Sequence, residues 1–286
     1  MRLRVATFNI HHGVGTDGRL DLGRTADVIA ATGATVVGLQ EVDRTLSERS
    51  AWADQSAWLG DRLGMEVVHG ATIDRGPPPG SPVGAPGRRY GNALLSAHPV
   101  RSWQALRLPV GSGRHEPRGV VDAVVDVDGH TVRCAVTHLQ NRSRSERRAQ
   151  AAHLVDLLTS REVSPGATPD PATDVAAADD PGTDGPGTTR PSGEGTATVL
   201  LGDMNAGPET PEMRALTTVL VDAWAAVGAG DGHTFPARRP IARIDHVLVH
   251  GPVRPVGAEV VDTRASDHRP VVVDVDLGVA PTDGAV

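Results

Sequence analysis

The sequence predicts an α/β fold, because helical and strand-like segments alternate through the first half of its 286 residues. Its 39% hydrophobic content is enough for one large α/β domain or two small ones. Polar residues also recur at the ends of apolar strands, where α/β proteins collect ligands and chemistry. Aromatic residues make up 2% of the chain, so the core must be built from Val, Leu, Ala and Ile.

The first half contains four expected strands and two expected helices. The strands are expected at residues 2–9, 36–40, 65–69 and 92–96. Helices are expected at residues 20–31 and 52–63, and Gly33 and Gly64 are expected to end them. Residues 74–91 are rich in Pro and Gly and predict a loop.

The second half begins with two runs that suit an antiparallel hairpin. These are residues 120–127 and 131–138, joined by a short turn. Residues 143–160 predict an amphipathic helix, and a shorter helix is expected near residues 212–220. Three further strands are expected at residues 198–201, 244–249 and 271–277.

An acidic, low-complexity segment interrupts this pattern at residues 162–196. It holds seven acidic residues and one arginine, so it carries −6 of the chain's net charge of −7. It has too few large apolar residues to offset its ordering entropy, and we expect it to be disordered. An interdomain linker is the alternative, but the motifs on its two sides belong to one site. We therefore expect one domain, residues 1–161 and 197–278, with a flexible tail at 279–286.

Charge and cysteine content limit the function classes. Outside the acidic segment the chain is close to neutral, so charge alone does not indicate a nucleic-acid partner. The one cysteine, Cys134, excludes intramolecular disulfides and is expected to be a buried packing residue. No secretory leader and no apolar run of roughly 20 residues is visible. We expect a soluble, cytoplasmic monomer.

The polar residues at strand ends form a recurring pattern. Singly, each can be explained as a turn residue or a satisfied side chain. Their repeated occurrence on successive strands indicates a common site. The residues are Asn9, Glu41, His138, Asp203, Asn205, Asp245, Asp267 and His268.

These residue types suit one kind of chemistry. Carboxylates and amides without cysteine favour a hard divalent cation such as Mg²⁺, Mn²⁺ or Ca²⁺. Histidines can carry or donate protons around a phosphate. Hydrolysis of a phosphoester needs an aligned water, a cation and help for the leaving oxygen. The sequence therefore predicts a metal-dependent phosphoester hydrolase.

Seven short segments together resemble the endonuclease/exonuclease/phosphatase superfamily. That group includes pancreatic-type deoxyribonucleases, abasic-site endonucleases, neutral sphingomyelinases and inositol-polyphosphate 5-phosphatases. The resemblance covers residues 2–277 apart from the acidic segment, and it implies a four-layer αββα sandwich of two mixed sheets flanked by helices. The segments are "TFNIHHG", "LQEVD", "YGNALLS", "VTHLQ", "LLGDMN", "RIDHVLV" and "SDHRPVV".

The resemblance also implies catalytic roles. Asp203 would orient or deprotonate the attacking water, and Asn205 would fix the position of Asp203 and hydrogen-bond the phosphate. His268 would stabilise charge on the phosphorus centre, with its tautomer held by Asp245. His138 would contact the phosphate or assist the leaving group.

On the metal side, the resemblance implies that Glu41 is the principal ligand, with Asn9 and Asp267 nearby. Some relatives carry an acidic ligand two residues after the asparagine of the first motif. This chain has His11 there, and His11 either ligates the metal or lines the substrate pocket.

Two further residues are candidates for substrate binding. Arg118 lies where many bacterial relatives carry an arginine, so it either meets a phosphate oxygen or is a solvated strand-edge residue. Asn92 either supports the pocket through its amide or only begins a strand.

Two functions compete on this reading: a metal-dependent hydrolase and a catalytically silent binding module on the same fold. The completeness of the set of site residues favours the enzyme.

The phosphoester could be nucleic acid, a small phosphorylated molecule or a lipid. A short basic groove for a nuclease could be built from Arg44, Arg49, Arg75, Arg88 and Arg89. No apolar interfacial segment stands out for a lipid substrate.

Overall fold

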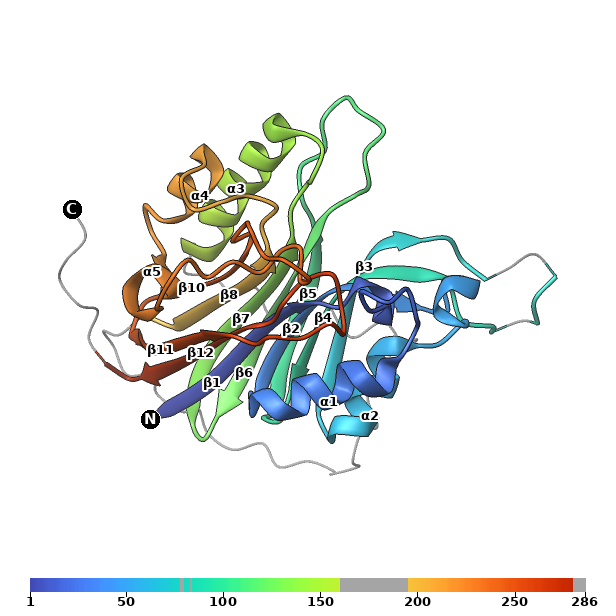
Figure 1. The fold of residues 1–286 in the computed structure, drawn as a ribbon, viewed down its shortest axis with the longest axis horizontal. Helices are drawn as coiled ribbons and strands as arrows, with labels where there is room; N and C mark the ends of the chain where they lie inside the picture. Colours follow the sequence, from blue (N-terminus) through green and yellow to red (C-terminus); the bar gives the residue numbers. More distant parts are fainter. Residues whose placement is uncertain (78–79, 83, 160–194, 280–286) are drawn as a thin grey trace, which may run out of the picture.

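Two six-stranded sheets pack face to face in the computed structural model, which describes residues 1–77, 80–82, 84–159 and 195–279 (Figure 1). The first sheet has the order β11-β12-β1-β2-β4-β3 and the second β5-β6-β7-β8-β10-β9. The strands are β1 (Arg2–Asn9), β2 (Val36–Arg44), β3 (Glu66–Asp74), β4 (Arg89–Ser96), β5 (Val100–Arg107), β6 (Gly119–Val127), β7 (His130–His138), β8 (Ala197–Asp203), β9 (Val221–Asp222), β10 (Asp245–His250), β11 (Val253–Val260) and β12 (Val271–Leu277). The helices are η1 (His11–Gly13), α1 (Leu22–Thr32), η2 (Glu48–Ser50), α2 (Gln55–Leu63), α3 (Arg144–Thr159), α4 (Pro211–Leu216) and α5 (Ala223–Val227).

Three apolar layers hold these elements together. The middle layer lies between the sheets and contains Val36 of β2. The second layer holds α1 and α2 on the outer face of the first sheet and contains Val37, the next residue of β2. The third holds α3 and α4 on the second sheet through Leu154 and Met213 (Figure 1). Strands buried on both faces read as continuous apolar runs, as seen in β2. The predicted four-layer α/β sandwich is confirmed.

Both sheets are mixed, with one parallel pair each. The parallel strands β1 and β2 are connected through α1, and β7 and β8 are connected through α3. All other paired strands are antiparallel. Parallel neighbours end at the same edge of a sheet, so residues that follow them are brought together.

Aspartate caps set the starts of the first two helices. Asp21 accepts a hydrogen bond from the Arg24 backbone at 2.9 Å, and Asp54 accepts one from Ala57 at 3.1 Å. These caps place the first helical residue at Leu22 and Gln55, two and three positions after the predicted starts. The predicted ends are confirmed, because Gly33 and Gly64 adopt φ of +65° and +66° as left-handed caps.

The structure corrects several predicted strand limits. Much of the predicted loop 74–91 is a loop, but β3 extends to Asp74 and β4 begins at Arg89, so its ends belong to the sheet. Strands β5 and β11 were not predicted, and each lies at the edge of a sheet. An edge strand has a hydrogen-bonded neighbour on one side only, so β11 tolerates Pro255 and the irregular register before Gly257.

Smaller corrections concern the helices of the second half. Helix α4 ends at Leu216 instead of near residue 220, and the short α5 was not predicted.

Cys134 is fully buried, as expected. Within the described ranges, no helix is long and apolar enough to cross a membrane. The acidic segment 162–196 and the tail 279–286 fall almost entirely outside the described residues.

Candidate active site

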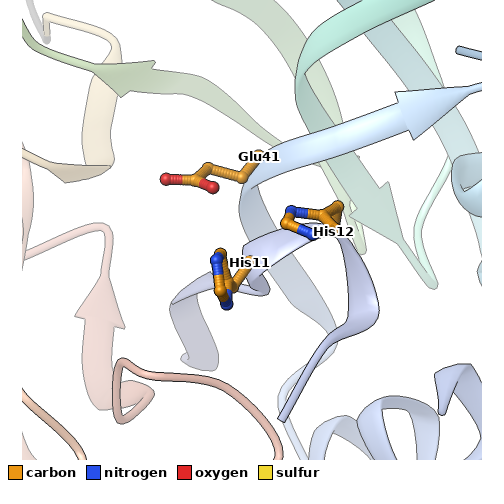
Figure 2. A group of neighbouring side chains, drawn as sticks. All are labelled: His11, His12 and Glu41. Atoms are coloured by element: carbon orange, nitrogen blue, oxygen red, sulfur yellow. The ribbon is translucent and has the colours of Figure 1, made fainter. Parts of the chain in front are cut away.

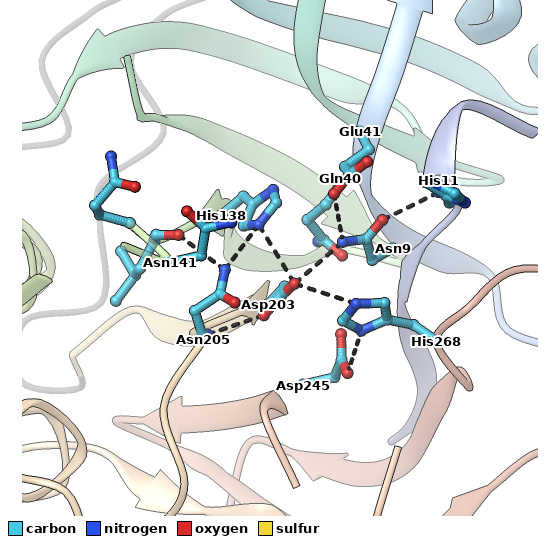
Figure 3. A network of polar contacts seen from close by, with 12 residues as sticks. Asn9, His11, Gln40, Glu41, His138, Asn141, Asp203, Asn205, Asp245 and His268 are labelled. Atoms are coloured by element: carbon cyan, nitrogen blue, oxygen red, sulfur yellow. Dashed lines mark hydrogen bonds and ion pairs between the residues drawn. The ribbon is translucent and has the colours of Figure 1, made fainter. Parts of the chain in front are cut away.

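Strand register brings three predicted catalytic residues side by side. Asp203, the last residue of β8, is paired with His138 on β7 and with Asp245 on β10. On the facing sheet, Asn9 ends β1 opposite Gln40 of β2. These strand ends meet at one edge of the sandwich (Figure 3). As predicted, Asn9, His138 and Asp203 close their strands, and Asp245 begins its strand.

One carboxylate oxygen, Oδ2 of Asp203, lies at the centre of this group. It accepts a hydrogen bond from Asn9 Nδ2 at 3.1 Å. His138 Nε2 lies 3.3 Å away, and His268 Nε2 lies 3.7 Å away (Figure 3). The other oxygen, Oδ1, accepts from the backbone N–H of Asn205 at 2.9 Å. Asp203 is 1% exposed, so all these contacts are shielded from bulk water.

Asn205 is fixed by its backbone and its amide. Its φ is +48°, a left-handed conformation that asparagine adopts more readily than most residues. Its Nδ2 donates to the backbone oxygen of Leu139 at 3.0 Å. The amide is thereby held next to His138, whose Nε2 lies 2.9 Å from Nδ2.

The charges of Asp203 and His268 depend on each other. Burial and the adjacent Asp245 carboxylate raise the pKa of Asp203 to about 7. Burial alone would lower the pKa of His268, but Asp245 and Asp203 together raise it to about 10. His268 is consequently an imidazolium at neutral pH. Its Nδ1 donates to Asp245 Oδ2 at 2.9 Å, which leaves Nε2–H facing the centre of the site.

His138, unlike His268, is neutral. Burial, the Arg118 guanidinium and charged His268 hold the pKa of His138 well below its ordinary value. The ring is neutral, and its Nδ1 accepts a hydrogen bond from Arg118 Nη1 at 3.1 Å. The proton therefore lies on Nε2, which donates toward Asp203 and does not accept from Asn205.

Arg118 thus has partners other than the phosphate expected from the sequence. Its side chain is 4% exposed and donates to Glu116 at 2.6 Å as well as to His138. Only its Nε is buried without a partner among the described residues. In this arrangement Arg118 sets the tautomer of His138.

A β-bulge presents Glu41. Strand β2 continues to Arg44, so Glu41 does not close the strand as predicted. Leu39 pairs with Ala93 and Val42 with Gly91, so two residues of β2 face Asn92 alone. The backbone of Glu41 has φ of +59° at this point. Bulges next to active sites redirect side chains in this way.

Asn92 supports the bulge from β4. Its side chain is 2% exposed and donates to the Gly119 backbone oxygen on the facing sheet at 3.0 Å. Asn92 lies inside β4 and does not begin it, and its amide connects the two sheets. Its support of a substrate pocket stays a prediction.

The carboxylate of Glu41 is suited to a cation. Burial raises its pKa above the ordinary value, and the hydrogen bond from Asn9 Nδ2 at 3.2 Å offsets part of that shift. Asp267 is near enough to raise the pKa further, and Asp267 Oδ1 lies 3.8 Å from His11 Nδ1. Within the described part of the chain Glu41 forms no ion pair. A divalent cation would supply the missing positive charge, and a carboxylate oxygen is a ligand that such ions accept.

Most members of the proposed basic groove are already paired. Arg44 bonds Asp54 at 2.8 Å, and Arg89 bonds Asp74 at 2.9 Å. Arg49 donates twice to the fully buried Asp43, at 2.9 and 2.6 Å. Their charge is largely neutralised inside the protein.

Sequence reasoning missed several residues that hold the site. Thr234 donates to Asp245 Oδ2 at 2.5 Å, and the Phe235 ring lies 4.7 Å from the His268 ring. Ser266 donates to the Asn9 backbone oxygen at 2.7 Å. Thr234 and Phe235 lie in a loop with no periodicity, so no pattern marks them. Ser266 stands beside the "DH" pair and could have been noticed there.

Comparison with known proteins finds a family model and solved structures that agree with one another. A family model described as the endonuclease/exonuclease/phosphatase family matches residues 6–268. A solved endonuclease/exonuclease/phosphatase from Beutenbergia cavernae is 26% identical with a TM-score of 0.69, covering 98% of this chain and 73% of that one. No curated protein sequence gives a significant match.

Two further solved structures share the fold. A mannosyl-6-phosphatase from Bacteroides thetaiotaomicron is 16% identical with a TM-score of 0.69, covering 96% of this chain and 100% of that one. The human Nocturnin catalytic domain is 17% identical with a TM-score of 0.63, covering 96% of this chain and 94% of that one.

Proposed function

This chain belongs to the endonuclease/exonuclease/phosphatase family, and from that premise we propose that it is a divalent-metal-dependent phosphoester hydrolase. The observation that carries the proposal is the convergence on Asp203 Oδ2. Asn9, His138 and His268 reach this oxygen from three separate segments. The proposed reaction is in-line attack of an activated water on phosphorus.

The residues present fit a resident cation. Glu41 would hold it, with Asn9 and Asp267 close by. When bound, the cation would neutralise the phosphoryl oxygens and lower the energy of charge developing on them. The protein's own side chains would accept the proton from water, bind the phosphate and assist the leaving oxygen.

Asp203 is the proposed base. With a pKa of about 7, it is ready to accept a proton from water near neutral pH. Asn9 and the backbone of Asn205 hold the two carboxylate oxygens in fixed positions. The Asn205 amide would orient a phosphate oxygen beside the attacked phosphorus.

The two histidines divide the remaining tasks. His268 is charged, so its Nε2–H would donate to the phosphoryl oxygen that gains charge in the transition state. Asp245 holds that ring in one orientation through Nδ1, and Thr234 donates to the same Asp245 oxygen. Neutral His138 would use its Nε2–H at the phosphate or the leaving oxygen, with Arg118 keeping its proton on that nitrogen.

The competing function is a silent binding module. A degenerate site would be expected to have lost members or their contacts, whereas these residues form one connected set. We expect hydrolysis of bis-p-nitrophenyl phosphate, its loss in excess EDTA, and recovery on adding Mg²⁺ or Mn²⁺. Full turnover in excess chelator would contradict metal dependence, and no turnover with any metal would favour the silent module.

The paired arginines favour a small phosphoester over a long polyanion, because little free positive charge is left at Arg44, Arg49 and Arg89. One relative by fold is a mannosyl-6-phosphatase, so phosphorylated sugars belong in the test. A side-by-side assay would compare DNA, abasic DNA, RNA, sphingomyelin, inositol phosphates and sugar phosphates. A preference for DNA or RNA at physiological salt would overturn this choice.

A further inference from the structure

Two adjacent histidines follow β1 in an uncommon backbone conformation. His11 and His12 have φ of +45° and +43°, and Gly13 continues the turn at +79°. Left-handed backbone costs free energy in residues other than glycine, and it persists where the surroundings hold it. Three hydrogen bonds hold this turn: His11 N to Asn9 Oδ1 at 3.0 Å, Gly13 N to Ile10 O at 2.8 Å and Gln55 Nε2 to His12 O at 2.7 Å.

The turn brings both imidazoles to Glu41, which is itself left-handed in its bulge (Figure 2). One ligand atom from each of the three residues lies within 4.8 Å of the other two. The three residues are half-buried, so an ion can reach them from solvent. The two rings meet edge to face, with centroids 4.5 Å apart.

Both rings have an unsatisfied nitrogen. The Nδ1 atoms of His11 and His12 are buried and have no hydrogen-bond partner among the described residues. Buried polar atoms are rarely left unpaired, since each costs free energy. Ring packing alone would account for the edge-to-face contact, but it would not account for two unsatisfied nitrogens beside a carboxylate.

Two nearby positive charges oppose a cation here, and one of them, His268, is paired with Asp245. Arg49 lies close enough to act electrostatically on His12 and Glu41. Its guanidinium is offset by Asp43, which is fully buried and accepts two hydrogen bonds from it. The net charge of that pair is zero, so Glu41 keeps its attraction for a cation.

We propose that His11 and His12 join Glu41 as ligands of the bound cation, so that the centre prefers a transition metal such as Co²⁺ or Zn²⁺ to Mg²⁺. Imidazole nitrogens bind these metals well, whereas Mg²⁺ prefers oxygen ligands. The proposal rests on the metal dependence proposed above, but it concerns binding and can be tested without turnover.

The test uses the full-length chain after EDTA treatment and removal of the chelator, with the metal alone as the probe. Calorimetric titration would give Kd for Co²⁺ and for Mg²⁺, and the visible spectrum of Co²⁺ would report its ligands. The variants are His11→Asn, His12→Asn and the double variant, because asparagine tolerates the left-handed conformation and offers an oxygen. His130→Asn, at the opposite end of β7 from His138, is the matched control.

We expect wild type and His130→Asn to bind Co²⁺ more tightly than Mg²⁺. Each site variant should weaken Co²⁺ binding by about tenfold or more while changing Mg²⁺ binding far less. The nitrogen-dependent features of the Co²⁺ spectrum should disappear in the double variant. Circular dichroism would confirm that each variant is folded.

An unchanged ratio of Co²⁺ to Mg²⁺ affinity in the folded double variant would overturn the proposal. So would a wild-type Co²⁺ spectrum typical of oxygen ligands only. A wild-type protein that binds Co²⁺ through nitrogen but hydrolyses no phosphoester would support this inference and contradict the proposed function. Failure of the ligand proposal and failure of the proposed hydrolase function therefore give different results.

Discussion

The side chain of Asp203 lies between a second carboxylate, Asp245, and two imidazoles, and its ionisation follows from that placement. Burial and Asp245 raise its pKa, whereas charged His268 lowers it. Asp245 and Asp203 keep His268 charged, whereas burial, Arg118 and charged His268 leave His138 neutral. One buried cluster thus contains a carboxylate of raised pKa, a charged donor and a neutral donor at the same pH, which is the division of tasks that the proposed hydrolysis needs.

Replacing this base is the most direct residue-scale test. Asp203→Asn keeps the size of the side chain but removes its charge and basicity. We expect turnover to fall by about two to four orders of magnitude, the usual range for a lost general base. The control is Asp126→Asn, since Asp126 pairs with exposed Arg101 away from the site. Turnover and circular dichroism would be measured on the same preparations.

A purely structural role for Asp203 gives a different result. The variant would then be less stable, but its activity per folded molecule would stay near that of wild type. A folded Asp203→Asn protein with near-normal turnover on its best substrate would remove this residue from the proposed mechanism.

The raised pKa of His268 predicts how stability changes with pH in the metal-free protein. Folding raises this pKa from 6.5 to about 10, so the native state keeps a proton that the unfolded chain loses. The stabilisation is complete below the unfolded pKa and is lost as pH rises through about 10. The melting temperatures of wild type and His268→Gln, both in EDTA, should therefore converge over this interval. A difference in melting temperature that stays constant or grows with pH would show that His268 does not hold its proton in the native state.

At the scale of elements, the strand interiors and helix ends could be read from sequence, but the bulge could not. Apolar runs located β1, β7 and β8, and glycines located the ends of α1 and α2. Edge strands β5 and β11 contain few or no fully buried residues, so no apolar run marks them and they were missed. The bulge at Glu41 depends on the pairing of β2 with β4, and such register comes from tertiary contacts.

The close packing of the sheets gives an element-scale prediction at Gly38 of β2. A Cβ added there would lie 2.8 Å from Leu201 Cβ and 3.1 Å from Val136 Cγ2 on the facing sheet. Neither atom is the end of a flexible side chain, so Gly38→Ala must move the backbone. We expect a loss of about 1–3 kcal/mol in the free energy of unfolding, the usual cost of overpacking. Urea denaturation would measure it.

Gly195→Ala is the control for this substitution, because no atom of the described residues lies within 4 Å of a Cβ added at Gly195. We expect its urea midpoint to match that of wild type. Equal midpoints for Gly38→Ala and Gly195→Ala would mean that the two sheets are less tightly packed than the structure shows.

At the scale of the whole molecule, the site exists only because the two sheets face each other. Asn9 comes from the first sheet and Asp203 from the second, and they lie 194 positions apart in sequence yet share a hydrogen bond. Strand-end polarity predicted that Asn9, His138 and Asp203 lie close together, as they do in the structure. It could not predict that His138, Asp203 and Asp245 lie in one register, because that depends on strand order. The contacts of Thr234 and Ser266 could not be predicted either, because they form only when the loops are folded.

The connection across the acidic segment gives the last prediction. The segment joins α3, which ends at Thr159, to β8, which begins at Ala197, and these complete a crossover from β7 to its parallel neighbour. Such helix-to-strand connections commonly need about 2–6 residues. Deleting residues 165–192 leaves residues 160–164 and 193–196 to make this connection, which is long enough. Loop closure depends weakly on length, so we expect melting temperature and metal-dependent turnover close to those of the full chain. A large loss of either would show that the segment contributes to the fold or to the site.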